Sequence, residues 1–570
     1  MHQDTEKQTV TMPYAQSAEP LRHNTLFSRL MPHFFTEDVS PDNYPLIELQ
    51  RRVCWVGLAL IAQALNEIDR KIYLPYVRFL IPWESMIPFV LIVASFVAMW
   101  MAFRPTALKK RVGKSSASQS RPRRWQRIVL VMVLLTSIAG GIEFGRSIAM
   151  GFFMPPQYTN DGTSIDTNAA SLLLEGRNPY TDSSILSLVR RFPIQPYWTT
   201  PLRQGQLADA LTYPSTWELR TILDTDLKAG TAPEFESKVS YPSLSFLTLL
   251  PFVWLNIYNV LPFYLLCYLL LVIIGLKVVR PEIRPWLLLL SLANVSMWTS
   301  VVGGNVDLLY ILFIVLAWLA QDSRRWSAIF LGLAIASKQP AWLFVPFYAI
   351  MILRQYNFKE VLYRLSIAGI IALALNLPFI LWSPQAWFAG VLAPIADPMF
   401  PLGVGLIAVS FTPLVPILPG TVYLALEAIA MLFCLGWYWR ICKQHPESAM
   451  LLAVLPLFFA WRSLPSYFYC AAFPIIILQA AYTLPNRGGR PRKALRPAWR
   501  LQFAPPETNE LPVGITSHAA TRFFHALAKS IVPSTRVLNN KASIQSQPHH
   551  SPAATYLPAL PWIPPPKSIA

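Results

Sequence analysis

Two carboxylates lie in a polar stretch that directly follows a long apolar segment. The stretch, residues 155–180, reads PPQYTNDGTSIDTNAASLLLEGRNPY and carries Asp161 and Asp166. Because the preceding segment is long enough to cross a bilayer, we expect both acids in water at a membrane surface. An ionised carboxylate in a partly desolvated pocket can take the proton from a hydroxyl that attacks an activated sugar. Asp161 and Asp166 are therefore candidate catalytic bases.

The same acids also fit an ordinary structural role. Thr-Asn-Asp-Gly is a typical turn sequence, and Asp166 fits as the cap of a helix that begins at Thr167. Gly176 is expected to end that helix. The stop is either a simple termination or a device that aims Asn178 and Tyr180 back at the acids, where they would contact substrate.

Further polar residues occur where the chain enters or interrupts apolar segments. Tyr241 lies where the chain returns to the membrane, and we expect it as an interfacial anchor and a pocket wall. Asn305 and Asp307 begin an apolar helix, whereas Lys338 and Arg462 each lie between two apolar runs. Ionised groups at membrane depth are costly and normally face a cavity or a partner. Arg462 is suited to bind a phosphate bidentately, with Lys338 as a second positive charge. The alternative is that these cations extend to the interface or pair with Asp307.

The composition excludes an ordinary soluble domain. Of 570 residues, 54% are hydrophobic and 14% are charged, and 48 Lys and Arg outnumber 30 Asp and Glu. The excess gathers in a run over 104–127 and in the tail after 487. Basic runs beside apolar segments mark the cytoplasmic side and its anionic lipids, so we expect membrane lipids and no nucleic acid as partners. The five cysteines lack metal-ligand spacing and indicate neither a metal site nor a disulfide framework.

The apolar segments predict an all-α polytopic membrane protein with about 10–13 transmembrane helices. The clearest segments are 85–103, 128–149, 260–276, 286–302, 305–320, 364–382, 421–439 and 466–483; less distinct are 53–67, 243–256, 402–418, 448–461 and the pair 326–337 with 340–353. The basic run before Ile128 places the loop over 155–240 on the outer face. This topology requires that 243–256 does not cross and that the pair returns to its starting side.

These signals divide the chain into four regions. A polar N-terminal segment covers 1–50, and a membrane hairpin with a basic cytoplasmic loop covers 51–127. A transmembrane core covers 128–484 and includes the long outer loop 155–240, in which we expect short helices on the membrane surface. Residues 485–570 are basic and Pro-rich and are expected to form a disordered cytoplasmic tail.

A series of short motifs lies in a fixed order between about residues 128 and 480. The motifs are Ala169-Ala170, Leu172–Leu174, Gly176, Asn178-Pro179-Tyr180, Tyr241-Pro242-Ser243-Leu244, Gly304-Asn305 and Gly332 with Lys338. In this order they resemble the GT-C superfamily of integral-membrane glycosyltransferases. Within it, the chain is most similar to the polyprenyl-phosphate-mannose-dependent alpha-mannosyltransferases that build phosphatidylinositol mannosides. Asp166 falls near a position that the family fills with Tyr, which leaves open which acid is the base, and the long stretch 181–238 leaves the acceptor open.

The resemblance implies a GT-C-like bundle and an inverting hexose transfer at the outer face, with mannose as the expected sugar. The donor would be a polyprenyl-phosphate sugar and the acceptor a lipid or glycan. Asp161 or Asp166 would deprotonate the acceptor, while Arg462 and Lys338 would hold the phosphate as it leaves. No cofactor is expected, although a divalent metal stays open because some relatives use one. The expected location is a bacterial plasma membrane.

Two other classes of function compete with a transferase. A lipid-linked glycan flippase or transporter would use Lys338, Arg462 and Asp307 to line a path at mid-membrane depth. It gives the outer loop no necessary role. A membrane scaffold would use its Pro-rich tail to bind partners, but it leaves the acids of the outer loop unexplained. The loop therefore favours the transferase.

Overall fold

The computed structural model describes residues 33–36, 43–72, 85–103, 124–154, 160–192, 194–210 and 212–483, all of them within the unit 1–509. Almost every element among them is a helix. The predictions for most of 1–50, for the basic run over 104–123 and for the tail 485–570 lie outside the described residues.

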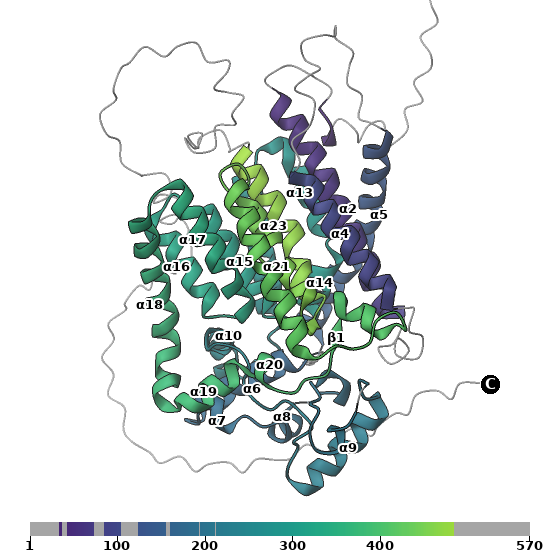
Figure 1. Cartoon of the computed structure of the whole chain (residues 1–570), viewed down its shortest axis with the longest axis vertical. Coiled ribbons are helices and arrows are strands. Elements are labelled where there is room, and N and C mark those ends of the chain that lie inside the picture. The colour runs from purple at the N-terminus through teal and green to yellow at the C-terminus, as the bar shows by residue number, and fades with distance from the viewer. Residues whose placement is uncertain are drawn as a thin grey trace, which may run out of the picture. The chain divides into compact units, whose positions relative to one another are not determined.

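Six helices in the described part are long and apolar enough to cross a membrane. They are α4 (Met86–Phe103), α5 (Arg124–Ile148) with its π-helical extension η4 (Ala149–Phe153), α12 (Leu261–Val278), α18 (Phe358–Trp382), α21 (Gly420–Ile441) and α23 (Ser466–Thr483). Figure 1 shows α4, α5, α21 and α23 running along the bundle, with α18 at its edge. The prediction of an all-α, multi-pass membrane protein is therefore confirmed, while the likeness to a GT-C bundle stays a prediction.

Fewer segments qualify as spans than the 10–13 predicted. Segment 286–302 is broken at Asn294, whose backbone is not helical, into α13 (Arg284–Ala293) and α14 (Val295–Gly303). This pair bends by 53° and makes a seventh span if it is counted as one. Segment 402–418 holds only the short 3-10 helix η9 (Leu406–Phe411), and 448–461 holds α22 (Ala449–Leu452) and η11 (Leu455–Phe459). Segment 53–67 lies in α2 (Tyr44–Ile72), whose charged ends dilute its apolar middle.

The predicted topology requires that 243–256 does not cross and that the pair 326–353 returns to its starting side. Each of these segments forms a short helical hairpin. Segment 243–256 forms α10 (Leu244–Leu247) and α11 (Leu250–Trp254), which are too short to cross. The pair 326–353 forms α16 (Arg324–Ile335), η8 (Gln339–Leu343) and α17 (Phe344–Gln355). The start of α16 and the end of α17 meet, because Arg324 and Tyr356 line one hollow of about 400 Å³. Arg324 also pairs with Glu360 near the start of α18, at 2.8 Å.

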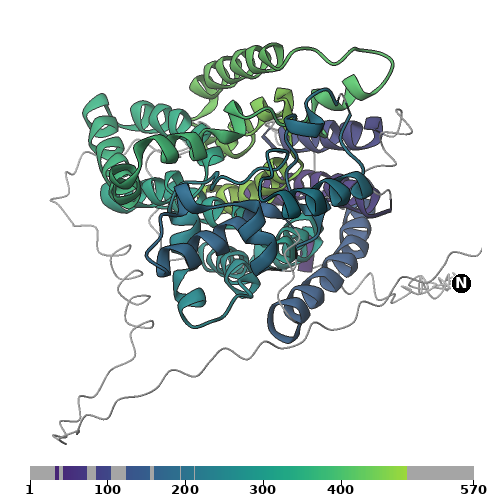
Figure 2. The ribbon, with the colours of Figure 1, turned by 90° about the horizontal axis from the view of Figure 1, so that it is seen from below.

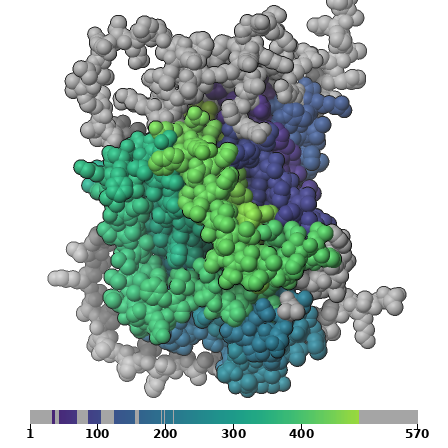
Figure 3. Space-filling view, viewed as in Figure 1, coloured from purple at the N-terminus to yellow at the C-terminus, as the bar shows by residue number. Residues whose placement is uncertain are grey.

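The outer loop folds into short helices, as predicted. They are α6 (Asp161–Leu174), α7 (Pro179–Asp182), α8 (Ile185–Arg191), the 3-10 turns η5 (Pro196–Trp198) and η6 (Gly205–Leu207), and α9 (Thr216–Ala229). Ser215 and Glu218 form a capping box at the start of α9. In Figure 1, α6 to α9 gather at the lower end of the bundle, with α19 (Pro384–Val391) and α20 (Ala393–Ala396) beside them. Figure 3 shows the blue-teal surface of this loop below the green helices.

Arg462 lies on a two-stranded parallel sheet at this end of the bundle. Strand β1 (Leu402–Gly403) pairs with β2 (Arg462–Ser463). Gly403 has φ 146°, and a Cβ there would lie 2.3 Å from the carbonyl oxygen of Ser463. Only glycine permits this approach, so the close contact of the two strands fixes the backbone that carries Arg462.

The remaining long helix, α15 (Asp307–Leu319), is buried in the middle of the bundle. It packs against α16, α12 and α23. Figure 2, seen from the end that carries the outer loop, shows α21 at the margin and the loop helices in front of the bundle. The start of α15 therefore lies under the outer loop, where it meets α6.

Candidate functional site

The start of α6 is fastened to the junction between α14 and α15. Asn160 caps α6 by accepting from the backbone N–H of Thr163 at 2.8 Å, and its amide donates to Asn305 Oδ1 at 3.1 Å and to the carbonyl of Gly303. The Thr163 hydroxyl donates to the carbonyl of Gly303 at 3.2 Å and to that of Gly304. Asn305 thus positions α6, and its predicted contact with substrate stays a prediction.

The structure corrects the alternative role that the sequence suggested for Asp166. The helix begins at Asp161, not at Thr167, so Asp166 lies inside α6 and does not cap it. The cap is Asn160, and because both residues precede stretches that suit a helix, local spacing does not distinguish them. The expectation that Asp166 lies in water is also wrong, since it is 0% exposed.

Asp166 lies in a polar environment that offsets only part of the free-energy cost of burying its carboxyl. Its Oδ1 accepts from the Ser245 hydroxyl at 3.0 Å, whereas its Oδ2 has no hydrogen-bond partner among the described residues. Burial raises the pKa of Asp166 to about 8, against the opposing effects of the Ser245 hydrogen bond and the charge of Lys338. Near neutral pH this carboxyl is therefore held mostly as the neutral acid.

Asp161 differs from Asp166 in being partly exposed at the first turn of α6. Its Oδ1 accepts from the backbone N–H of Gly162 at 2.9 Å. Burial raises the pKa of Asp161, whereas Thr200 and the charge of Arg462 lower it. The raised pKa makes Asp161 a stronger base than an ordinary carboxylate while it keeps access to a substrate.

Arg462 reaches the same region from β2. Its Nη1 lies 2.7 Å from Met399 Sδ, and the neighbouring Trp461 indole donates to the carbonyl of Met399 at 2.9 Å. Among the described residues, Arg462 forms no ion pair within 4.0 Å. Its guanidinium is therefore available to an anion, and its charge is felt by Asp161 and by the phenol of Tyr213.

Lys338 and Asp307 form a buried ion pair, which was the alternative to phosphate binding by Lys338. Lys338 Nζ lies 3.0 Å from Asp307 Oδ1, and the two residues are 7% and 1% exposed. Lys338 Nζ also lies 4.8 Å from the ring centroid of Tyr241. Because Asp307 already compensates its charge, Lys338 offers an incoming phosphate less attraction than Arg462 does.

Tyr241 lies between the two groups of charges. A Cβ on Gly162 would come within 3.0 Å of the Tyr241 hydroxyl, which places that hydroxyl against the first turn of α6. The Tyr241 phenol interacts electrostatically with Lys338, Asp307, Asp161 and Asp166. The Tyr180 hydroxyl donates to the carbonyl of Tyr241 at 2.9 Å, and Asn178 caps α7 by accepting from the N–H of Tyr180 at 3.0 Å. Tyr180 and Asn178 therefore support the backbone of Tyr241.

Nine residues were predicted to form one site, and the structure brings most of them to the same end of the bundle. Asp161 and Arg462 form a partly exposed group, and Asp166, Asp307 and Lys338 form a buried group, with Tyr241 between them. Asn305, Asn178 and Tyr180 are attached through hydrogen bonds to other parts of the protein.

The sequence reasoning missed three residues near this site. Thr200 and Tyr213 come from the long stretch 181–238, which has no motif that would single them out. Glu427 lies within α21 and interacts electrostatically with Tyr467, which also interacts with Lys338 and Arg462. A lone acid in an apolar span is a recognisable signal, because such groups normally face a cavity or a partner.

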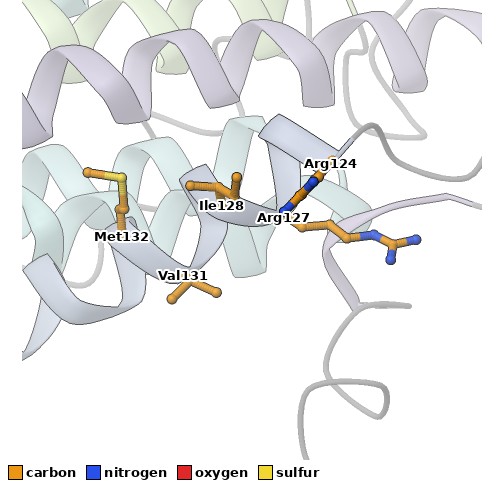
Figure 4. A pocket seen from close by; sticks show the side chains of 5 residues that line it. All are labelled: Arg124, Arg127, Ile128, Val131 and Met132. Atoms are coloured by element: carbon orange, nitrogen blue, oxygen red, sulfur yellow. The ribbon is translucent and has the colours of Figure 1, made fainter.

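Two surface hollows lie away from this site, one beside Arg324 and Tyr356 and one on α5. Within the described residues, no group of three or more His, Cys, Asp or Glu is arranged to hold a metal ion. One hollow of about 290 Å³ lies on α5, and Figure 4 shows the five side chains along its first turns: Arg124, Arg127, Ile128, Val131 and Met132. It lies at the opposite end of α5 from the outer loop.

The comparisons with known proteins add no relative. No protein-family model, no curated protein and no solved structure matches the chain.

Proposed function

We propose that this protein is a membrane glycosyltransferase that moves a hexose, with mannose the expected sugar, from a polyprenyl-phosphate donor to a lipid or glycan acceptor at the outer face. One observation carries the proposal: Asp161, a partly exposed carboxylate with a raised pKa, lies within electrostatic reach of Arg462, a guanidinium without an ion-pair partner among the described residues. A base next to a phosphate-binding cation is what sugar transfer from a lipid phosphate needs.

Asp161 is the proposed base. Its carboxylate takes the proton of the acceptor hydroxyl as that oxygen forms a bond to the anomeric carbon of the sugar. The bond from the anomeric carbon to the phosphate oxygen breaks, and its electron pair leaves with the polyprenyl phosphate. Attack from the face opposite the phosphate inverts the configuration. The burial of Asp166 argues against the same role for it, because a 0% exposed carboxyl offers no access to a substrate hydroxyl.

Arg462 is the proposed phosphate ligand. The departing phosphate gains negative charge, and a positioned guanidinium stabilises that charge more in a partly desolvated site than in water. Lys338 is assigned a supporting role. Its Nζ lies 3.0 Å from Asp307 Oδ1, and this ion pair holds the start of α15 under α6. The proposal includes no metal step.

The test is sugar transfer by the purified protein in proteoliposomes. Radiolabelled polyprenyl-phosphate mannose is added together with bacterial lipid acceptors, and the labelled product is separated from the donor. We expect transfer by the parent and a loss of at least about 100-fold in Asp161→Asn. If Asp161→Asn inserts normally and transfers as fast as the parent, the proposed base is wrong. If the donor crosses the bilayer without any transfer, the protein is a transporter.

A further inference from the structure

The hollow of about 400 Å³ between α16, α17 and α18 is lined mainly by charged side chains. Three of them are cations and two are acids: Arg324, Lys359, Arg364, Asp322 and Glu360. Figure 1 shows α18 running from this end of the bundle to α19, which lies beside the outer loop. The hollow therefore lies at the opposite end of the bundle from Asp161 and Arg462, on the side that the basic run before Ile128 predicts to be cytoplasmic.

The buried side of the hollow is formed by an ion pair. The side chain of Arg364 is 1% exposed, and its Nε lies 2.7 Å from Glu360 Oε1. Its Nη1 donates to the carbonyl of Gln321 at 2.5 Å, and its Cζ lies 4.9 Å from the ring centroid of Tyr356. A carboxylate, a carbonyl and an aromatic ring thus hold this guanidinium, so one positive charge is fixed at the back of the hollow.

The open side of the hollow carries two further cations. The side chain of Arg324 is 58% exposed, and its Nε lies 2.8 Å from Glu360 Oε2, so both Nη atoms remain available to an anion. Lys359 is exposed and forms no ion pair within 4.0 Å among the residues that the structure describes. Because Arg324 and Arg364 share the single carboxylate of Glu360, the hollow keeps an excess of positive charge.

Apolar and aromatic side chains lie beside the hollow on the first turns of α18. Phe358 and Leu362 are exposed and, being four residues apart, lie on one face of this helix. The ring centroid of Tyr363 lies 4.3 Å from Arg324 Cζ. Because α18 is long and apolar enough to cross a membrane, this combination of cations and aromatic rings at its start is typical of the boundary between acyl chains and headgroups.

We propose that this hollow binds the phosphate group of an anionic lipid from the adjacent leaflet, with Arg324 and Lys359 as its ligands and Arg364 as a fixed charge behind them. The two Nη atoms of Arg324 suit two phosphate oxygens, and Lys359 adds a compact charge. Basic pockets between spans on the cytoplasmic side bind lipid headgroups in this way. The exposed face of Phe358 and Leu362 favours a lipid over free phosphate, because acyl chains cover such a face.

The test uses the full-length protein in nanodiscs of phosphatidylcholine that contain a trace of a photoactivatable lipid. The probe is either phosphatidylglycerol, which is anionic, or phosphatidylcholine, which carries no net charge. Cross-linked peptides are mapped by mass spectrometry. We expect phosphatidylglycerol to label the segment 356–364 at least about fivefold more than phosphatidylcholine, because one cation near an anionic lipid changes its affinity by about that factor. Equal labelling by the two lipids would overturn the proposal.

Two pairs of matched variants assign the labelling to the hollow. Lys359→Gln and Arg324→Gln should each lower the labelling by phosphatidylglycerol about fivefold, and both keep the buried ion pair at the back of the hollow. Lys443→Gln and Arg440→Gln are the controls, since both cations are exposed near the end of α21 and neither lines the hollow. Labelling that falls no further in the two variants than in their controls would contradict the assignment.

A competition experiment distinguishes the lipid from free phosphate. Inorganic phosphate is added to the nanodiscs, with chloride at the same ionic strength as the control. Both salts should lower the labelling of the segment 356–364 to the same extent, because screening acts on any exposed charge. If phosphate abolishes the labelling and chloride does not, the hollow takes free phosphate and the lipid is the wrong source. None of these measurements requires sugar transfer, so they test the hollow independently of the proposed function.

Discussion

The guanidinium of Arg462 lies close enough to Asp161 to lower the pKa of its carboxylate, although the two residues come from opposite ends of the core sequence. Asp161 begins α6 in the outer loop, and Arg462 lies on β2 just before α23. Their proximity makes each a separate test of the account, because one is assigned to the acceptor and the other to the donor.

Arg462→Gln should weaken use of the donor more than use of the acceptor. A hydrogen bond to a charged group contributes about 1.5–3 kcal/mol, which corresponds to a rise of roughly 10- to 100-fold in the donor KM. The measurement is transfer rate against donor concentration. Arg146→Gln is the control, since Arg146 is half-exposed at the outer end of α5 and pairs with Glu143 at 3.7 Å. A donor KM that is equal in the two variants would remove Arg462 from the phosphate site.

The rate of transfer should fall with acid at a pH above the ordinary carboxyl value. Burial raises the pKa of Asp161 above 3.8, and protonation abolishes a base, so activity is present above the raised pKa and lost as the pH falls through it. Arg462→Gln should move this fall in rate to still higher pH, because the guanidinium lowers the pKa of Asp161. The pH profile of kcat/KM reports the free enzyme. If the rate falls at the same pH in Arg462→Gln as in the parent, a group other than Asp161 controls the pH dependence.

The Lys338–Asp307 pair should matter for stability more than for chemistry. Removing one partner leaves a buried charge uncompensated, so Lys338→Met or Asp307→Asn should lower the free energy of unfolding by roughly 3–5 kcal/mol. The double change Lys338→Met with Asp307→Asn removes both charges and should recover much of this loss. Thermal unfolding in detergent measures the cycle. The exposed pair Arg177 and Asp182, at 3.0 Å, is the control and should give less than about 1 kcal/mol.

A contrary outcome is that the variants with a single change at the buried pair are as stable as those with a change at the exposed pair. That result would show that Lys338 and Asp307 do not form a closed ion pair in solution. A partly open pair would leave the Lys338 ammonium accessible to a phosphate. In that case Lys338 would return to the role that the sequence first suggested for it.

Gly403→Ala should reduce activity by displacing Arg462. Its φ of 146° and the 2.3 Å approach of a Cβ to the Ser463 carbonyl force β1 and β2 apart. We expect a loss of at least about tenfold in kcat/KM, because small displacements of a ligand are costly for catalysis. Gly436→Ala on α21 is the control, since a Cβ there meets nothing within 4 Å. Equal activities in the two variants would show that the β1–β2 sheet does not position Arg462 for transfer.

The features that local sequence determines were predictable. Gly176 ends the region of α6 with φ 74°, as its position after an apolar run indicates. Gly304 with φ 66° stops α14 before Asp307 opens α15. The outer loop was expected to hold short helices, and Ser183–Phe192 contains α8. These signals depend on a few neighbouring residues, so they can be recognised from the sequence alone.

The features that depend on tertiary contacts were not predictable. An unbroken apolar run conceals the bend at Asn294, since its side chain caps α14 only after the chain has turned. The polar surroundings of the buried Asp166 come from Ser245 and Lys338, which lie far along the chain. Thr200 belongs to no motif, and its effect on the pKa of Asp161 arises only once distant segments of the chain meet.

The most direct test of the proposed function is a structure of the protein with a bound polyprenyl phosphate. The account predicts the phosphate at the Arg462 guanidinium, at a hydrogen-bond distance of roughly 3 Å, with Asp161 facing the position that the sugar would occupy. A phosphate bound at the opposite end of the bundle, or separated from Asp161 by packed helices, would contradict it.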